Sequence, residues 1–100
     1  MRRTRDDIIS DILEAIDSKI NRISSIMKNV NLSASLAKKY ISMLAEEGLI
    51  QDYNGEYKLT EKGRKILEQL RNMRKMELEL ANIIYEVRKE PVVFHQFYSK

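Results

Sequence analysis

The chain has 100 residues, of which 18 are Lys or Arg and 15 are Asp or Glu, and its formal net charge is +3. This length predicts one domain with an extension, and the modest core of so small a domain favours oligomerisation. The absence of Cys excludes disulfides and thiolate metal sites. No apolar run is long enough to span a bilayer, and the MRRTRDD start lacks the apolar segment of a secretory signal. We therefore expect a cytoplasmic protein.

The charge is distributed unevenly along the chain. Residues 1–60 carry nine basic and nine acidic side chains, whereas residues 61–100 carry nine basic and six acidic ones. A surface for nucleic acid therefore has to come from local clustering of basic groups and not from a bulk positive field.

Two helices are predicted in the first third of the chain. Thr4 is a good N-cap and has Asp7 at capping-box spacing, so the first helix begins there and runs to about Asp17. We expect Ile20 to start a short extended segment and residues 22–30 to form a second helix. Apolar residues at helical spacing support both helices: Ile8, Ile9, Ile12, Leu13, Ile16, Ile23, Ile26, Met27 and Val30.

A third helix begins the most informative stretch of the chain, residues 33–70. Ser33 is its N-cap, and Gly48 supplies the left-handed conformation that ends a helix at little cost. Leu32, just before the cap, is expected to enter the core. The helix should face that core with Ala37, Tyr40, Ile41 and Leu44.

A β-hairpin is predicted directly after this helix. Leu49–Tyr53 forms the first strand, and Asn54-Gly55 predicts a type I′ turn, because both of its central positions need positive φ. In the resulting register Ile50 pairs with Leu59, and Tyr57 lies on the same face as this pair.

The last predicted helix is too long for the domain to cover. Thr60 is its N-cap, and it can continue to Lys89, just before Pro91. Such a helix of about 29 residues is about 43 Å long. Its apolar residues recur in three- and four-residue steps from Ile66, interrupted by Glu77, which suggests packing against a second copy. The expected dimerisation seam comprises Leu70, Met73, Met76, Leu80, Ile83, Ile84 and Val87.

Little in the sequence supports catalysis. The single His, His95, lies between Phe94 and Phe97 in the apolar and aromatic tail of residues 91–100. A lone His in that setting is more often packed or exposed than a catalytic base. No Asp/Glu/His cluster has metal-ligand spacing, and the isolated Gly residues form no phosphate-binding loop. We expect no enzyme activity, no cofactor and no metal, and no small-molecule ligand is evident.

The third helix is the candidate DNA-reading helix. Ser and Lys side chains can bond phosphates or base edges, and the amides at a helix N-terminus can bind a phosphate. An ordinary solvated helix face is the alternative, and the neighbouring hairpin favours the DNA interpretation. The candidate contacts are Ser33, Ser35, Lys38, Lys39 and Ser42, with Glu46 on the same exposed face.

The hairpin and the start of the chain supply further candidate contacts. Tyr53 and Lys58 are expected at the sugar–phosphate backbone, although Asp52 and Glu56 bring negative charge to the same hairpin, so a purely structural hairpin is the alternative. Basic groups elsewhere could reach phosphates or a minor groove. They are an N-terminal arm of Arg2, Arg3 and Arg5, for which a frayed terminus is the alternative, and Arg22 and Lys28 beside the second helix.

Residues 24–50, SSIMKNVNLSASLAKKYISMLAEEGLI, and the following NGEYKLTEKGRKIL resemble a family of small archaeal winged helix-turn-helix proteins. This family includes crenarchaeal chromatin-associated proteins that dimerise through a long C-terminal helix. The resemblance covers about residues 5–75 and implies double-stranded DNA binding by a homodimer joined by an antiparallel coiled coil. By position it assigns Ser33, Ser35, Lys38 and Lys39 to the reading helix, and the residues from Asn54 to Lys58 to the wing.

The chain departs from this family pattern at three places. Ser24-Ser25 stands where the family often has Thr-Arg, which removes an expected backbone contact. In the third helix the family has Leu-Lys-Lys, whereas this chain has Leu36-Ala37-Lys38-Lys39. This difference changes the apolar contact of the helix with the core. The tail after Pro91 lies outside the pattern and bears on the dimer geometry.

Together these patterns predict a mainly α-helical fold with a small β-hairpin wing. Its expected parts are a winged helix-turn-helix head at 1–62, a dimerisation helix at 63–90 and an aromatic tail at 91–100. The predicted function is a homodimeric, nucleoid-associated DNA-binding protein, either a transcription regulator or an architectural protein. The alternative is a winged helix that binds another protein, which the near-neutral head and the acidic hairpin favour.

Overall fold

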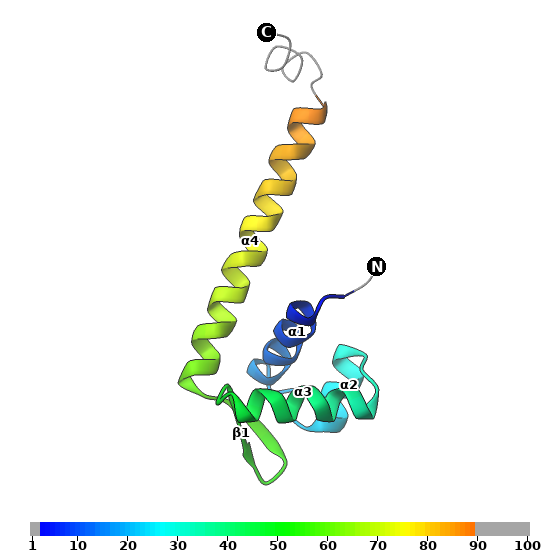
Figure 1. Ribbon diagram of the computed structural model, residues 1–100, viewed down its shortest axis with the longest axis vertical. Helices are drawn as coiled ribbons and strands as arrows, with labels where there is room; N and C mark the ends of the chain where they lie inside the picture. Colours follow the sequence, from blue (N-terminus) through cyan, green and yellow to red (C-terminus); the bar gives the residue numbers. More distant parts are fainter. Residues whose placement is uncertain (1–2, 90–100) are drawn as a thin grey trace. The chain divides into compact units, whose positions relative to one another are not determined.

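The structure, a computed structural model, describes residues 3–89. Internal contacts divide the chain into two units, the first ending at Leu70 and the second beginning at Arg71. No helix within the described range is long and apolar enough to cross a membrane. Figure 1 shows the elements in chain order: α1 (Arg5–Asp17), α2 (Ile23–Val30), α3 (Ala34–Glu46), β1 (Ile50–Tyr53), β2 (Glu56–Leu59) and α4 (Glu61–Lys89). The predicted mainly helical fold with a β-hairpin is confirmed.

The predicted helix caps are present. The Thr4 hydroxyl accepts a hydrogen bond from the Asp7 amide at 3.1 Å, and the Asp7 carboxylate accepts one from the Thr4 amide at 3.0 Å. The two bonds complete the capping box of α1. The Ser33 hydroxyl accepts the Leu36 amide at 3.3 Å and caps α3. The Thr60 hydroxyl accepts the Gly63 amide at 3.0 Å and starts α4. Each cap satisfies an amide that has no partner within its own helix.

The segment between α1 and α2 differs in one respect from the expectation. Ile20 begins no strand, and its amide instead donates to the carbonyl of Ala15 at 2.9 Å, which closes the end of α1. The link to the hairpin is a single backbone bond, from the Tyr57 amide to the Asn21 carbonyl at 2.8 Å. One bond is too few to extend the sheet, so the sheet of the described chain has two strands.

The hairpin β1–β2, called the wing below, has the predicted register. Ile50 pairs with Leu59 and Asp52 pairs with Tyr57. Asn54 and Gly55 have φ values of 53° and 87°, as a type I′ turn requires. The first strand begins at Ile50, one residue later than predicted. Gly48 has a φ of 74° and ends α3 as expected.

Among residues 3–89, the buried core lies entirely in the first unit. Ile12, Leu13, Ile26, Leu44 and Leu67 are its largest fully buried side chains. The predicted stripe of α4 included Ile66 and Leu70 but missed Leu67, which is 1% exposed. Ile66 and Leu70 are only partly buried against this core. Leu70 therefore contributes to the first unit, although the sequence assigned it to the dimerisation seam.

Gly63 explains how closely α4 approaches the rest of the first unit. A Cβ atom at this position would collide with the carbonyl oxygen of Leu49. Gly63 is buried, and its lack of a side chain lets the first turn of α4 pack against the start of the wing. In the sequence alone, Gly63 is only an isolated glycine.

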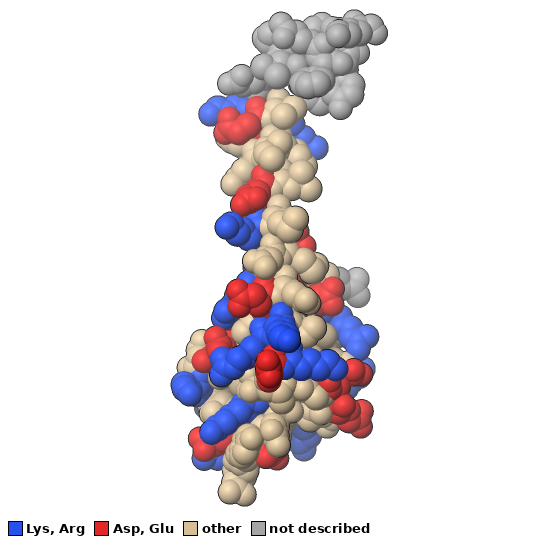
Figure 2. Space-filling model, turned by 90° about the vertical axis from the view of Figure 1, so that its left-hand side faces the viewer, with Lys and Arg blue, Asp and Glu red and all other residues tan. Residues whose placement is uncertain are grey.

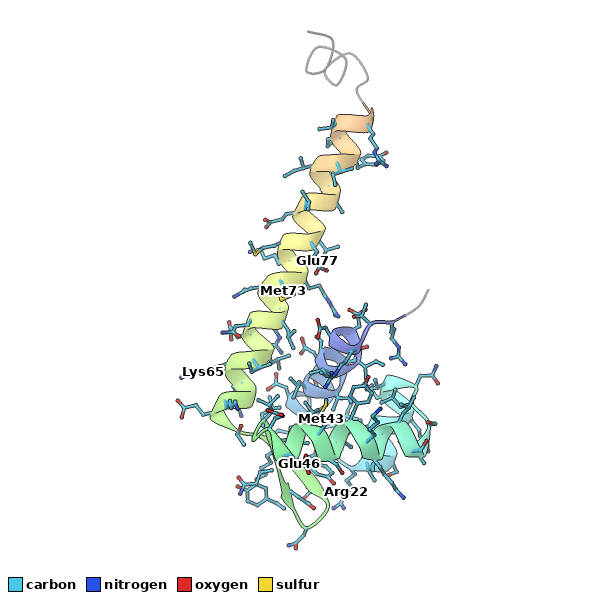
Figure 3. All side chains as sticks on the ribbon, viewed as in Figure 1. Arg22, Met43, Glu46, Lys65, Met73 and Glu77 are labelled. Atoms are coloured by element: carbon cyan, nitrogen blue, oxygen red, sulfur yellow. The ribbon has the colours of Figure 1, made fainter. Side chains whose placement is uncertain are left out.

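The second unit consists of the rest of α4. Nearly every side chain from Arg71 to Lys89 is exposed, and only Val87 is intermediate. Met76, Leu80 and Ile83 are 67%, 58% and 60% exposed, so the predicted seam forms an apolar surface that residues 3–89 leave uncovered. Figure 3 shows Met73 and Glu77 projecting from this helix. Leu78 and Tyr85, which lie outside the predicted seam, are also large and exposed.

Candidate nucleic-acid interface

The exposed face of α3 presents the predicted basic and hydroxyl groups. Ser35, Lys38, Lys39 and Ser42 are all exposed, whereas Ala37, Ile41 and Leu44 on the opposite face are buried, as predicted. The exposed set and Glu46 are called the reading face below. Because three buried residues hold the helix against the core, the orientation of this face is determined by packing.

The two lysines of the reading face are available to a ligand. Among residues 3–89, neither the Lys38 nor the Lys39 side chain has a hydrogen-bond or ion-pair partner. The hydroxyls of Ser33 and Ser35 lie 3.4 Å apart at the start of the same helix. A helix N-terminus with small side chains and nearby cations can approach a phosphate closely. Glu46 is the one acid on this face, at its far end.

The wing holds its outward side chains in place. The Tyr53 hydroxyl donates to Gln51 Oε1 at 3.0 Å, and Lys58 Nζ lies 5.1 Å from the centre of the Tyr53 ring. Such a cation–π contact orders a lysine that would otherwise sample many rotamers. Tyr53 and Lys58 therefore form one connected pair on the exposed side of the wing. The sequence predicted that both residues contact the sugar–phosphate backbone of DNA.

Two acids of the wing have structural partners. The Asp52 carboxylate accepts the amide of Gly55 at 2.7 Å and so stabilises the turn. Glu56 lies 4.0 Å from the Arg22 guanidinium, which offsets part of its charge. Figure 3 shows Arg22 beside the hairpin. The acidic side chains of the wing thus have roles within the fold, Asp52 in the turn and Glu56 in an ion pair. Through this ion pair Arg22 belongs to the wing surface as well as to the start of α2.

Two arginines of the basic arm, Arg3 and Arg5, contact other parts of the first unit. Arg3 donates to the carbonyls of Val30 at 2.6 Å and Asn31 at 3.1 Å, and it lies 3.5 Å from Asp11. These carbonyls belong to the end of α2, where helix acceptors lack partners. Arg5 donates to the sulfur of Met43 at 2.8 Å. Both arginines therefore contact their own chain, and Arg2 lies outside the described residues.

Lys28 stands apart from the reading face. It lies in the last turn of α2, where a cation favours the helix dipole, and its side chain is exposed. Figure 2 shows Lys and Arg mixed with Asp and Glu on one face of the molecule, without an extended area of a single sign on that face. Local groups, and not a broad positive field, characterise this view, which agrees with the charge pattern of the sequence.

The junction between α3 and α4 contains contacts that the sequence did not indicate. The Thr60 hydroxyl donates to the carbonyl of Gly48 at 2.5 Å, and the Lys62 ammonium donates to the carbonyl of Glu47 at 2.9 Å. Together with the close approach at Gly63 they attach the first turn of α4 to the end of α3. The only signal for these contacts in the sequence is the run TEKG after the hairpin. Each of its residue types is also common at the start of a helix that makes no such contacts.

Tyr57 supports the wing from its inner side. Burial raises the pKa of its phenol, and the nearby Asp52 carboxylate raises this pKa further. The phenol therefore stays neutral at physiological pH and adds no negative charge to the wing. Within the described range, no three His, Cys, Asp or Glu side chains gather in a way that could hold a metal ion.

The arrangement of three helices, a two-stranded wing and a following helix agrees with the comparison with protein families. The profile of a family described as winged helix-turn-helix matches residues 2–78. The chain is a winged helix-turn-helix protein. This confirms the winged helix-turn-helix family predicted from its sequence.

Two solved structures show the same fold as this winged helix-turn-helix protein. Sso10a-2, a DNA-binding protein from Sulfolobus solfataricus, is 22% identical with a TM-score of 0.72, over 87% of this chain and 95% of the other. A MarR family protein from Bacillus stearothermophilus is 17% identical with a TM-score of 0.64, over 100% of this chain and 78% of the other. Among curated proteins, no significant match is found. At these identities the likeness establishes the fold alone.

Proposed function

We propose that this winged helix-turn-helix protein binds double-stranded DNA as a homodimer, with α3 in the major groove and the wing on the backbone. The observation that carries the proposal is the pair Lys38 and Lys39, which are exposed on the reading face and have no side-chain partner among residues 3–89. The DNA-binding description of Sso10a-2, a protein of the same fold, supports the same partner. Such a protein would work as a transcription regulator or an architectural protein in the nucleoid.

The ordered groups of the wing extend the proposed contact surface. Tyr53 and Lys58 form a preformed pair beside α3, and Arg22 reaches the turn of the wing from the start of α2. Ser42 and Lys28 add polar contacts at the margins. Arg3 and Arg5 would have to leave their present partners to reach DNA, so we assign them a smaller contribution than the sequence did.

The modest charge of one unit makes dimerisation important for affinity. Two linked heads bind the same duplex with a high effective concentration for the second contact, so weak individual contacts add up. The exposed seam of the second unit supports a second copy as the partner, because its apolar side chains lack cover from the part of the chain that the structure describes. Glu77 lies within that seam. In a parallel pair the two Glu77 carboxylates would face each other, which favours an antiparallel pair that separates them.

Charge reversal on the reading face tests DNA binding. Lys38→Glu combined with Lys39→Glu should weaken duplex binding by more than about 100-fold at low salt, because each lost phosphate contact also loses counterion release. Fluorescence anisotropy with random-sequence and candidate-specific duplexes over a salt series measures this effect. The slope counts phosphate contacts, and the ratio of affinities reports specificity.

A matched control separates local contact from net charge. Lys65→Glu combined with Lys75→Glu changes the net charge by the same amount at exposed positions of α4, a different helix from the one that carries the reading face. This variant should keep most of its affinity. Equal loss in both double variants, with circular dichroism showing both folded, would reject α3 as the reading helix.

A protein-binding module is the second candidate function. It is favoured by Glu46 on the reading face and by Asp52 and Glu56 on the wing, because these acids repel phosphates. If the natural chain shows no duplex binding at micromolar concentration and low salt, while remaining folded, this second function replaces the first.

A further inference from the structure

A polar recess of about 250 Å³ lies in the first unit, at the base of the wing. It is bounded by the end of α1, the segment after it, strand β2 and the first turn of α4. None of the groups that bound it takes part in the reading face of α3. Its polar lining comes from four separate parts of the chain, namely Asp17, Lys19, Asn21, Tyr57, Lys58 and Arg64.

The charges around this recess are predominantly positive. Three cationic side chains, those of Lys19, Lys58 and Arg64, are present with one carboxylate, that of Asp17. The Arg64 guanidinium is 3.6 Å from Asp17, and the Arg64 side chain is 68% exposed, so N–H groups remain available to a ligand. The Tyr57 phenol stays protonated because its pKa is raised, and Tyr57 adds a neutral polar residue to the lining.

Lys19 occupies an unusual backbone conformation at the rim of the recess. Its φ is 71°, in the left-handed region that favours glycine, and it directly follows the end of α1. The amides of Lys19 and Ile20 close that helix end by bonding the carbonyls of Ile16 and Ala15. Gly would satisfy this geometry at lower steric cost, so the local fold alone gives no reason for a lysine here.

We propose that this recess binds a small oxyanion of the phosphate type. One arginine and two lysines around one polar hollow suit the several acceptor oxygens of such an anion, and the volume admits a compact phosphate-bearing molecule. The sequence indicated no small ligand, because the participating residues are far apart along the chain and come together only in the folded unit.

Lys58 connects the recess to the wing. Its ammonium lies over the Tyr53 ring at 5.1 Å on the exposed side of the wing, and Lys58 is also one of the residues that line the recess. A bound anion competes for this ammonium. On the proposed DNA-binding function, the anion therefore weakens the contact between the wing and the DNA backbone.

Binding of the anion is measured first, in the absence of DNA, by titrating the ¹⁵N-labelled full chain with inorganic phosphate. Chloride replaces phosphate at constant ionic strength in the reference titration. Saturable shifts confined to the surroundings of Lys19, Asn21 and Lys58 are expected. Shifts that are unsaturable, or spread over all the cationic side chains, would show only general ion screening and would overturn the proposal.

Lys19→Gly provides the decisive variant. It removes one cation and accepts the φ of 71° without strain, so it should stay folded while phosphate binding weakens by about fivefold or more. Lys65→Gln removes an exposed cation that is next to Arg64 in the chain, and Lys65 itself does not line this recess. The phosphate affinity of this variant should match that of the natural chain. Equal weakening in both variants, or unchanged binding in Lys19→Gly, contradicts the assigned site.

A second arm tests the link to DNA. Phosphate should lower duplex affinity more than chloride at equal ionic strength, and Lys58→Met should remove this difference. If phosphate binds the recess but DNA affinity shows no such difference, the site stands and its coupling to the wing is rejected. If the natural chain binds no DNA at all, the proposed function fails while the phosphate titration still decides the site.

Discussion

The two parts of α4 have the same apolar period but different surroundings. Up to Leu70, its side chains pack against the first unit, where Leu67 is 1% exposed. Beyond Arg71, Leu80 and Ile84 are 58% and 43% exposed, although they continue the same three- and four-residue steps. Helical periodicity therefore predicts an apolar face but does not say which molecule covers it. The first part stabilises its own fold, and the second is suited to a partner.

The largest expected effect comes from truncating a leucine in the covered part of α4. Leu67→Ala should lower the free energy of unfolding by about 3 kcal/mol, because it removes a fully buried side chain and leaves a cavity. Urea denaturation followed by circular dichroism measures this loss. Leu78→Ala, at a position that is 62% exposed outside the seam, is the control and should change stability by less than about 0.5 kcal/mol. Similar losses in the two variants would remove the distinction between the two parts of the helix.

A charge placed in the exposed seam should act on assembly and not on the first unit. Leu80→Asp is expected to convert a dimer into a monomer at tens of micromolar, because two buried aspartates would lie within the shared apolar surface. Multi-angle light scattering measures the mass.

The matched control for the seam is Leu78→Asp, two residues away and equally exposed, which should leave the dimer intact. A natural chain that is monomeric at the same concentration would reject the seam. Dissociation by both variants would show that the dimer uses a wider face than the one assigned.

The smallest expected effect is a pH dependence that belongs to the first unit alone. The pKa of Tyr57 is raised in the folded chain by burial and by Asp52, so the unfolded chain releases this proton first as the pH rises. Stability from this group is therefore present below about pH 10 and declines above it.

Tyr57→Phe should reduce the decline in stability above pH 10, measured by thermal unfolding at several pH values. Tyr85→Phe, at a position that is 62% exposed in the second unit, should leave it unchanged. The same decline in the Tyr57→Phe chain as in the natural chain would show that other groups cause it.

Much of the fold follows from local chemistry that the sequence displays directly. Ser33 and Thr60 cap helices because each hydroxyl accepts a hydrogen bond from a backbone amide that has no partner within the helix. Asn54 and Gly55 specify a type I′ turn because both residues adopt positive φ. Once the turn is known, the pairing of Ile50 with Leu59 follows by counting along two antiparallel strands. These features depend on residues only a few positions apart, so they could be predicted without knowing the tertiary structure.

The candidate site was only partly predictable for a related reason. The exposed positions of Lys38 and Lys39 follow from the helical period, and the structure confirms their exposure. The partners of Arg3 on the end of α2 and the contact between Arg22 and Glu56 could not be predicted, because they join residues about 30 positions apart. The choice of Leu67 for the core also depends on the exact rotation of α4 against the first unit.

The sequence by itself determined the order of elements, the caps, the turn and the winged helix-turn-helix family, because periodicity and short-range hydrogen bonding express them locally. Only the tertiary structure decided that Gly63 must lack a side chain beneath the Leu49 carbonyl, and that Lys19, Lys58 and Arg64 surround one recess. The physical reason is that close packing and charge clustering arise between segments distant in the chain, where no local pattern records which atoms will meet.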